Sequence, residues 1–155
     1  MKNCVLCYLE KDGKYLMLYR NKKKNDENAG KWIGVGGKFE ENESPLQCMK
    51  REIFEETGFL VKSAALRSIV TFVSDEYETE YMFLYTVSDF DGKLSTCDEG
   101  DLKWIDKNEI YSLPMWEGDR IFLERIAKNA PYFDLKLVYE KNKLVRAILD
   151  GEEIV

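Results

Sequence analysis

The stretch GGKFEENESPLQCMKREIFEETGF, residues 36–59, decides the fold and most of the chemistry of this chain. Its second half carries the boundary signals of a helix. Ser44 suits the N-cap of a capping box, Pro45 suits the first helical position, and Gly58 suits the position just after the last helical turn. The spacing therefore predicts a helix over residues 45–57.

The predicted helix concentrates negative charge on one side. At about 100° per residue, Glu52, Glu55 and Glu56 fall in one sector. Like charges three or four positions apart destabilise a helix by a few tenths of a kcal/mol each, a cost that a bound cation reverses. Oxygen-only ligands favour Mg²⁺ or Mn²⁺. The alternative interpretation is a solvated acidic face, and spacing alone does not decide between the two.

The neighbouring residues of the same stretch are expected to support this sector. Leu46, Met49 and Ile53 share an apolar face and are predicted to lie in the core. Gly36 and Gly37 either let the chain turn tightly, so that backbone atoms approach a bound ion, or form an ordinary turn.

Strands and a second helix are predicted on both sides of this helix. NCVLCYLE and YLMLYR flank Asp12-Gly13, a strong hairpin signal, and a closing hairpin is predicted about Lys141-Asn142. Further strands are predicted at WIGV, LVKSAALRSIVTFVS, ETEYMFLYTVSDF and DLKWI, and a helix at GDRIFLERIAKN. Strands interrupted by two helices predict an α+β fold, a mixed sheet flanked by helices.

Composition limits the class of protein. The chain has 155 residues, 45% of them hydrophobic, which predicts a single domain over residues 1–155 with one core. Neither a signal peptide nor a membrane-spanning run is recognisable, so we expect a cytoplasmic protein. Its four cysteines are expected to be reduced thiols, since Cys4 and Cys7 differ in strand parity.

Charge and residue types limit the chemistry. The chain has no histidine, which excludes histidine-based acid–base catalysis and leaves the carboxylates to carry any chemistry. A net charge of −6 argues against binding a nucleic-acid polymer, whereas a small anionic substrate remains compatible if a metal neutralises it locally.

The complete pattern of residues 37–59 resembles the Nudix box, written G-x5-E-x7-R-E-U-x-E-E-x-G-U, where U is a bulky apolar residue. Every defined position is filled, with an aromatic residue where an aliphatic one is usual at the end: Gly37, Glu43, Arg51, Glu52, Ile53, Glu55, Glu56, Gly58 and Phe59. The order of elements before and after the box also resembles the Nudix α/β/α sandwich, so the resemblance extends over most of the chain.

The resemblance implies a Mg²⁺-dependent hydrolase of a nucleoside diphosphate linked to another group. It implies that Glu52, Glu55 and Glu56 ligate one or more metal ions together with the carbonyl of Gly36. Glu52 is the first candidate for activating the attacking water. Glu99 is a further candidate ligand, or the base itself.

Other acidic and basic residues have less direct roles in this hypothesis. Asp98 and Asp101 are rivals to Glu99, and an ordinary acidic loop is the alternative to all three. In the family the arginine of the box orients its glutamates, so we expect Arg51 and Glu43 to hold the site without touching substrate. Arg51 and Glu55 are also four positions apart, close enough to pair.

Substrate choice is predicted from two segments outside the helix, GKWIGVGGKFEENE and LPMWEGDRIF, which resemble the MutT and oxidised-purine nucleoside triphosphatase branch. There Trp116 is expected to stack on a purine, and Asp119 or Glu117 to hydrogen-bond its edge. The alternative is that Trp116 is a core aromatic and Asp119 an N-cap. Ile33 stands where mammalian relatives carry a base-reading asparagine, so it can supply apolar contact only.

Positive charge gathers at Arg20 and Lys22 to Lys24. This cluster either binds phosphates, with Lys22 as the candidate contact, or is a solvated loop.

The resulting hypothesis is a Mg²⁺-dependent enzyme that cleaves a nucleoside triphosphate to a monophosphate and pyrophosphate, with an oxidised purine such as 8-oxo-dGTP as substrate. Three alternative substrates are ADP-ribose, a nucleotide sugar and a dinucleoside polyphosphate. A non-catalytic nucleotide-sensing Nudix domain is an alternative of another class. The sequence leaves a monomer and a homodimer equally open.

Overall fold

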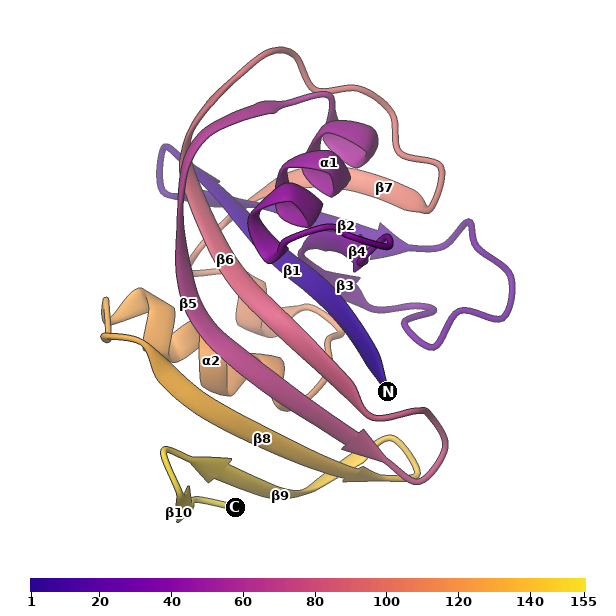
Figure 1. Ribbon diagram of the computed structural model, residues 1–155, viewed down its shortest axis with the longest axis vertical. Coiled ribbons are helices and arrows are strands. Elements are labelled where there is room, and N and C mark those ends of the chain that lie inside the picture. The colour runs from indigo at the N-terminus through magenta and orange to yellow at the C-terminus, as the bar shows by residue number, and fades with distance from the viewer.

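The computed structural model describes all residues 1–155 and has a mixed sheet with a helix on each side (Figure 1). The strands are β1 (Lys2–Lys11), β2 (Lys14–Arg20), β3 (Trp32–Ile33), β4 (Val35–Lys38), β5 (Leu60–Ser74), β6 (Glu80–Asp91), β7 (Gly100–Asp106), β8 (Phe133–Glu140), β9 (Lys143–Leu149) and β10 (Glu152–Glu153). The helices are α1 (Pro45–Thr57), α2 (Asp119–Ala127) and a 3₁₀ turn, η1 (Ile110–Ser112). The predicted α+β class and α/β/α layering are confirmed.

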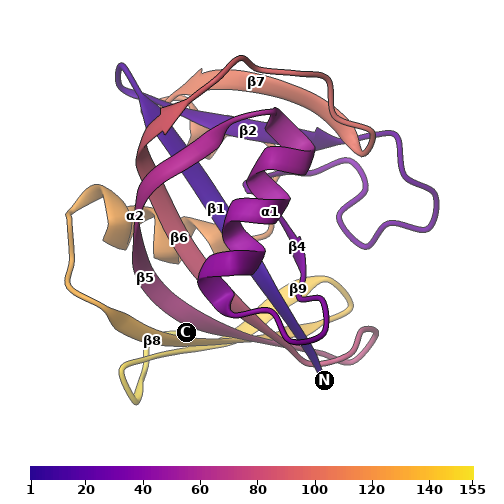
Figure 2. The same cartoon turned by 45° about the horizontal axis from the view of Figure 1, so that its top comes forward.

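The strand order is β10-β9-β8-β5-β6-β1-β2-β3, with β4 paired to β1 and β7 to β2. Two of the pairings are parallel, β1 with β6 and β5 with β8, and the others are antiparallel. Strand β1 pairs with β2 only next to their hairpin, and pairs with β4 over Cys4–Cys7. The sheet therefore divides at β1, and β2, β3 and β7 diverge as a separate leaf (Figure 2).

Both predicted hairpins form. Asp12 and Gly13 have φ values of 52° and 74°, and Lys141 and Asn142 have 49° and 64°. A positive φ at both central residues is what a two-residue hairpin turn of type I′ requires.

Helix α1 has the predicted bounds and caps. The Ser44 hydroxyl accepts a hydrogen bond from the Gln47 amide at 3.1 Å, and the Gln47 side chain accepts one from the Ser44 amide at 2.9 Å. Gly58 ends the helix at a φ of 83°, which only glycine adopts at no steric cost.

The predicted core face of α1 needs one correction. Met49 and Ile53 are fully buried, but Leu46 is 48% exposed. Leu46 lies in the first helical turn, and helical angle alone does not show how far the sheet extends beneath a helix. The face that is buried instead includes a box glutamate, Glu56.

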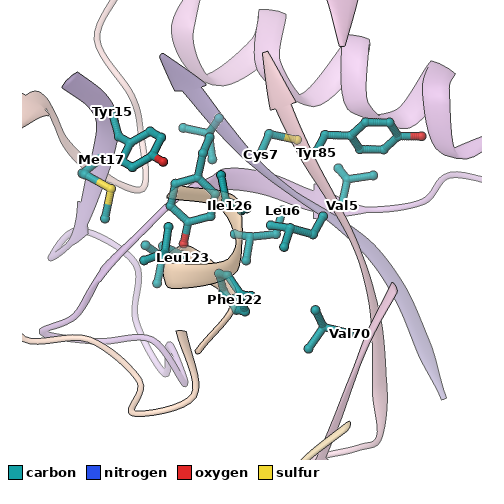
Figure 3. Packing of buried hydrophobic residues seen from close by; sticks show 14 of the residues in the cluster. Val5, Leu6, Cys7, Tyr15, Met17, Val70, Tyr85, Phe122, Leu123 and Ile126 are labelled. Atoms are coloured by element: carbon teal, nitrogen blue, oxygen red, sulfur yellow. The ribbon is translucent and has the colours of Figure 1, made fainter. Parts of the chain in front are cut away.

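The core lies on both faces of the sheet. Figure 3 shows β1 and β6 passing between the two helices, with Cys7 and Tyr85 on the side of α1, and Leu6 on the side of Phe122 and Leu123 of α2. The alternation along β1 is that of a strand covered on both faces. All four cysteines are free, as predicted. None of the helices is long and apolar enough to span a membrane.

Candidate active site

A cleft of about 660 Å³ opens between the two leaves of the sheet. One part, here called the acidic end, is lined by Gly36, Gly37, Arg51, Glu52 and Glu99. The other part, here called the tryptophan end, is lined by Asn28, Ile33, Phe72, Trp116 and Asp119. Residues that the sequence connects only through the resemblance thus share one continuous cavity.

Arg51 organises the acidic end. Its Nε and Nη2 both donate to the carboxylate of Glu43, the second at 2.9 Å, and its Nη1 donates to Glu52 at 2.7 Å and to Glu55 at 3.1 Å. The hydrogen bonds from Arg51 lower the pKa of Glu43 to about 2. The predicted pairing with Glu55 is confirmed, and Arg51 fixes the orientation of three carboxylates at once.

Gly36 and Gly37, which precede the helix, are glycines for a different structural reason from the turn that was predicted. Both lie within strand β4 and neither has a positive φ, so neither forms a turn. A Cβ at Gly37 would stand 2.4 Å from the carboxylate of Glu52, and one at Gly36 would stand 1.9 Å from the carbonyl oxygen of Val5. Glycine at these positions lets the Glu52 carboxylate and the β1 backbone approach β4.

Glu56 is the buried carboxyl of this end. Its Oε2 accepts a hydrogen bond from the Gly36 amide at 2.9 Å, and its side chain is 8% exposed. Burial, and then the neighbouring carboxyl of Glu99, raise the pKa of Glu56 well above its usual range. Burial also raises the pKa of Glu52. Glu55, by contrast, points to solvent with a side chain that is 55% exposed.

Glu99 is distinguished from its sequence neighbours by where it lies. It lines the cleft and pairs with Arg20 at 3.4 Å and with Lys23 at 3.6 Å. Asp98 and Asp101 are both exposed and do not line the cleft. Of the three rivals, only Glu99 can face a ligand in this cavity.

The basic loop also differs from the prediction in one residue. Lys22 does not line the cleft, because its Nζ donates to the carbonyl of Cys97 at 3.3 Å and pairs with Asp101 at 3.4 Å. Lys23 lines the cleft instead. The one-residue shift follows from the path of the loop, which no local pattern specifies.

The acidic end offers donors suited to a hard divalent cation, although no three acidic or cysteine side chains converge as they stand to hold one. Arg51 occupies one oxygen of Glu52 and one of Glu55, leaving Glu52 Oε2 and Glu55 Oε1 without a hydrogen bond. Glu56 and Glu99 are like-charged neighbours, and a cation would relieve their repulsion. An all-oxygen donor set of this kind fits the ligand preference of Mg²⁺.

Trp116 forms a wall of the tryptophan end and is also part of the core. The residue is 6% exposed, and its ring packs edge-on against Phe72 and Tyr139, with centroids 5.3 and 5.0 Å apart. Its Nε1 donates to Asn28 Oδ1 at 2.8 Å, and the Lys31 ammonium lies 4.3 Å from the ring centroid. Trp116 is therefore a core aromatic that also lines the cleft, and its stacking on a purine stays a prediction.

Asp119 is buried, 5% exposed, and lines the cleft. It is not the N-cap of α2, since Gly118 holds that position and no side chain caps the helix. Burial raises the pKa of Asp119 to about 8, opposed only by the charge of Lys31. Near neutral pH the side chain is therefore a neutral carboxylic acid that can donate as well as accept a hydrogen bond.

Two further predictions about this end can be compared with the structure. Glu117 lies outside the cleft and accepts a hydrogen bond from the Leu144 amide at 3.2 Å. Ile33 lines the cleft as an apolar, 9% exposed side chain, in keeping with its predicted role as an apolar contact.

Asn28 and Asp26 are among the cleft residues that the sequence did not indicate. Asp26 accepts the Nε–H of Arg20 at 2.8 Å and the amide of Asn28 at 3.1 Å, which fixes the loop against β2. Asn28 in turn bonds Trp116. Both stand in the polar run RNKKKNDENAGK, where composition indicates only a loop.

Comparison with known proteins agrees with this site. The model of the NUDIX domain matches residues 2–126. The chain belongs to the Nudix family and is a hydrolase acting on phosphoanhydride bonds.

Three relatives define its neighbourhood within the family. The chain is 34% identical over 127 residues to an uncharacterised Nudix hydrolase, YvcI, of Bacillus subtilis, covering 79% of this chain and 77% of that one. It is 33% identical over 101 residues to an oxidized purine nucleoside triphosphate hydrolase of Danio rerio, covering 63% of each. It is 31% identical over 126 residues to a CTP pyrophosphohydrolase of Escherichia coli, covering 80% of this chain and 90% of that one.

A solved structure extends the likeness beyond the family match. The MutT protein of Bacillus halodurans superposes with a TM-score of 0.87 at 27% identity, over 98% of this chain and 99% of that one. This places the chain in the MutT-like branch of the family.

Proposed function

We propose that this protein is a Mg²⁺-dependent nucleoside triphosphate pyrophosphohydrolase that releases a nucleoside monophosphate and pyrophosphate, with an oxidised purine nucleotide such as 8-oxo-dGTP as its favoured substrate. The observation that carries the proposal is the single cleft with carboxylates at one end and a tryptophan and a buried acid at the other. Such a cavity accommodates a charged phosphate chain and a flat base together.

In this proposal Glu52, Glu55, Glu56 and Glu99, with the Gly36 carbonyl, hold Mg²⁺ (Mn²⁺ is an alternative). The ion, when bound, supplies charge neutralisation at phosphate oxygens and lowers the pKa of a coordinated water. Glu52 is the proposed acceptor of the water proton, at the oxygen that Arg51 leaves free, with Glu99 as the alternative base.

Arg51 and Glu43 act on the other residues. The bidentate pair between Glu43 and Arg51 fixes the Arg51 guanidinium, and the guanidinium then orients Glu52 and Glu55. Lys23, which lines the cleft, is the proposed phosphate contact in place of Lys22.

The base is proposed to bind at the tryptophan end. Trp116 and Ile33 offer apolar surface, and Asp119 offers a hydrogen-bonding edge as a neutral acid. Asn28 supplies what Ile33 lacks: because an indole N–H only donates, the amide oxygen must face Trp116, and both N–H groups of the Asn28 amide stay available.

Two relatives support a triphosphate substrate and differ in the base. The Danio rerio protein is named for oxidised purine nucleoside triphosphates and the Escherichia coli protein for CTP. CTP is therefore the second candidate, beside the diphosphate-linked alternatives ADP-ribose, nucleotide sugars and dinucleoside polyphosphates. We also propose that residues 1–155 act as one domain, since β8 pairs with β5 and continues the same sheet.

The test is turnover by purified protein with Mg²⁺ on 8-oxo-dGTP, dGTP, CTP, ADP-ribose and a dinucleoside polyphosphate, each with an EDTA control. Pyrophosphate release is measured for the triphosphates and phosphatase-sensitive product for the others. We expect kcat/KM for 8-oxo-dGTP to exceed that for dGTP by about a hundredfold, equivalent to nearly 3 kcal/mol of discrimination.

The other outcomes separate the parts of the proposal. A preference for CTP would move the base assignment to a pyrimidine while keeping pyrophosphohydrolysis. A preference for ADP-ribose would replace the triphosphate. Binding of nucleotides without any turnover would favour the sensing alternative.

A further inference from the structure

We propose that Tyr139, on strand β8, is a positioning residue that sets the geometry of the tryptophan end and thereby nucleotide selectivity. The inference rests on the proposed function. Strand β8 lies outside residues 2–126, the part of the chain that matches the NUDIX domain, so this contribution belongs to the C-terminal strands of this protein.

The first observation is a buried hydrogen bond at the start of α2. The Gly118 amide donates to the Tyr139 hydroxyl at 2.7 Å, and Tyr139 is 1% exposed. The first amides of a helix have no partner within the helix, and Gly118, the N-cap, has no side chain with which to cap it. The Tyr139 hydroxyl instead accepts the amide of the N-cap residue itself, one residue before Asp119.

The second observation is steric. A Cβ at Gly118 would stand 2.5 Å from Leu137 Cδ1 and 2.8 Å from the Tyr139 hydroxyl. A side chain at residue 118 would displace the ends of the buried Leu137 and Tyr139 side chains, so residue 118 and strand β8 are packed directly against one another.

The third observation concerns the residues on either side of Gly118. The Tyr139 ring meets the Trp116 ring edge-on at 5.0 Å, and the β9 amide of Leu144 donates to Glu117 at 3.2 Å. Three consecutive residues, 116–118, are therefore each held by the β8–β9 hairpin. The hairpin is itself fixed by the parallel pairing of β8 with β5.

Tyr139 does not line the cleft, which determines the kind of effect it can have. Its hydrogen bond and ring contacts are with Gly118, Phe72 and Trp116, none of which belongs to the acidic end. Displacing it should move Trp116 and Asp119 relative to a base, and should leave the reacting phosphate where it is. The signature is a change in binding without a change in kcat.

The test is Tyr139→Phe, which keeps the ring and removes the hydroxyl. We expect KM for 8-oxo-dGTP to rise about fivefold, since a buried amide loses its partner, with kcat within about twofold of the wild type. We expect the Kd of 8-oxo-dGMP, measured by calorimetry in EDTA so that no metal contributes, to rise by a similar factor. Tyr132→Phe is the matched control, because Tyr132 is 52% exposed just before β8.

The outcomes distinguish this inference from the proposed function. A wild type without turnover on any nucleotide overturns the proposed function, and the monophosphate measurement still tests Tyr139. A folded Tyr139→Phe whose Kd and KM equal those of Tyr132→Phe overturns the inference. So does a loss confined to kcat, or a wild type that does not bind 8-oxo-dGMP.

Discussion

The two ends of the cleft are built in different ways. At the acidic end, all of the proposed ion ligands except Glu99 come from residues 36–56, a single strand, loop and helix. At the tryptophan end, the loop before β3, strand β5, the start of α2 and strand β8 each contribute separately. In the proposed function, the ion site is therefore encoded locally, whereas selectivity for the base depends on contacts between segments distant in the sequence.

The two ends also differ in how charge is compensated. Arg51 is shared among Glu43, Glu52 and Glu55, so most acids of the helix have a cation beside them. At the other end Asp119 is buried, and its only charged neighbour of consequence is Lys31. Arg51 thus compensates the charge of Glu43, Glu52 and Glu55, whereas Glu56 and Asp119, each buried without a salt bridge, have raised pKa values.

The largest expected effect tests the acidic end. Glu56→Gln should lower kcat by about a thousandfold or more, equivalent to about 4 kcal/mol, because a ligand to the ion loses its charge. The fold should persist, since the glutamine oxygen can still accept the Gly36 amide. Steady-state kinetics on the best triphosphate, together with a melting curve, measure both.

Glu41→Gln is the control, an exposed glutamate of the same loop-and-helix segment outside the Arg51 contacts. It should leave kcat within about twofold of the wild type. A well-folded Glu56→Gln with near-normal turnover would remove Glu56 from the proposed ion site and with it the contrast between the ends.

Sequence reasoning succeeded where the signal was local. The bounds and caps of α1, both hairpin turns and the pairing of Arg51 with Glu55 depend on residues within a few positions of one another. It failed where the outcome depends on how deeply a helix is covered by the sheet or on the path that a loop takes. Leu46 has the helical phase of a core residue and is exposed, because phase does not report how far the sheet extends beneath it.

The failures within the site have the same cause. Gly36 and Gly37 suggested a turn, yet a strand needs glycine there because Val5 and Glu52 approach from other elements. Lys22 and Lys23 are indistinguishable by pattern, and only the loop path directs one of them into the cleft. Asn28 carried no signal at all, since its partner Trp116 is 88 residues away.

The second prediction concerns the neutral carboxyl group. The pKa of Asp119 is raised to about 8, so between about pH 4 and pH 8 the native state holds a proton that the unfolded state has lost. This share of the free energy of unfolding is fully present below the unfolded pKa and falls as pH rises through the folded one. Asp119→Asn has no such group and should not lose this stability. From pH 5.5 to pH 8, the free energy of unfolding of the variant should therefore rise by about 1–3 kcal/mol relative to that of the wild type.

Denaturant unfolding curves of both proteins at pH 5.5 and pH 8 measure this difference. Contributions from all other titratable groups cancel because the two proteins share them. Asp89→Asn, at an exposed aspartate of β6, should show no such gain. If wild type and Asp119→Asn lose stability in parallel, Asp119 is ionised in the native protein, and the two ends compensate charge alike.

The smallest expected effect tests whether the tryptophan end reads the base through Asn28. Asn28→Asp keeps an oxygen for the Trp116 indole but replaces both amide donors by an acceptor. KM for the preferred nucleotide should rise about fivefold at unchanged kcat, as expected for the loss of one hydrogen bond in binding. Asn25→Asp adds the same charge to the same loop at an exposed cleft residue, so any common effect is electrostatic repulsion of phosphates. The Asn28 amide contributes to selectivity only if Asn28→Asp raises KM more than Asn25→Asp does, and if this additional rise differs between nucleotides with different bases. An equal rise in KM for both variants on every nucleotide would show that the loop acts on the phosphate chain through its charge and does not read the base. Charge would then govern binding along the whole cleft.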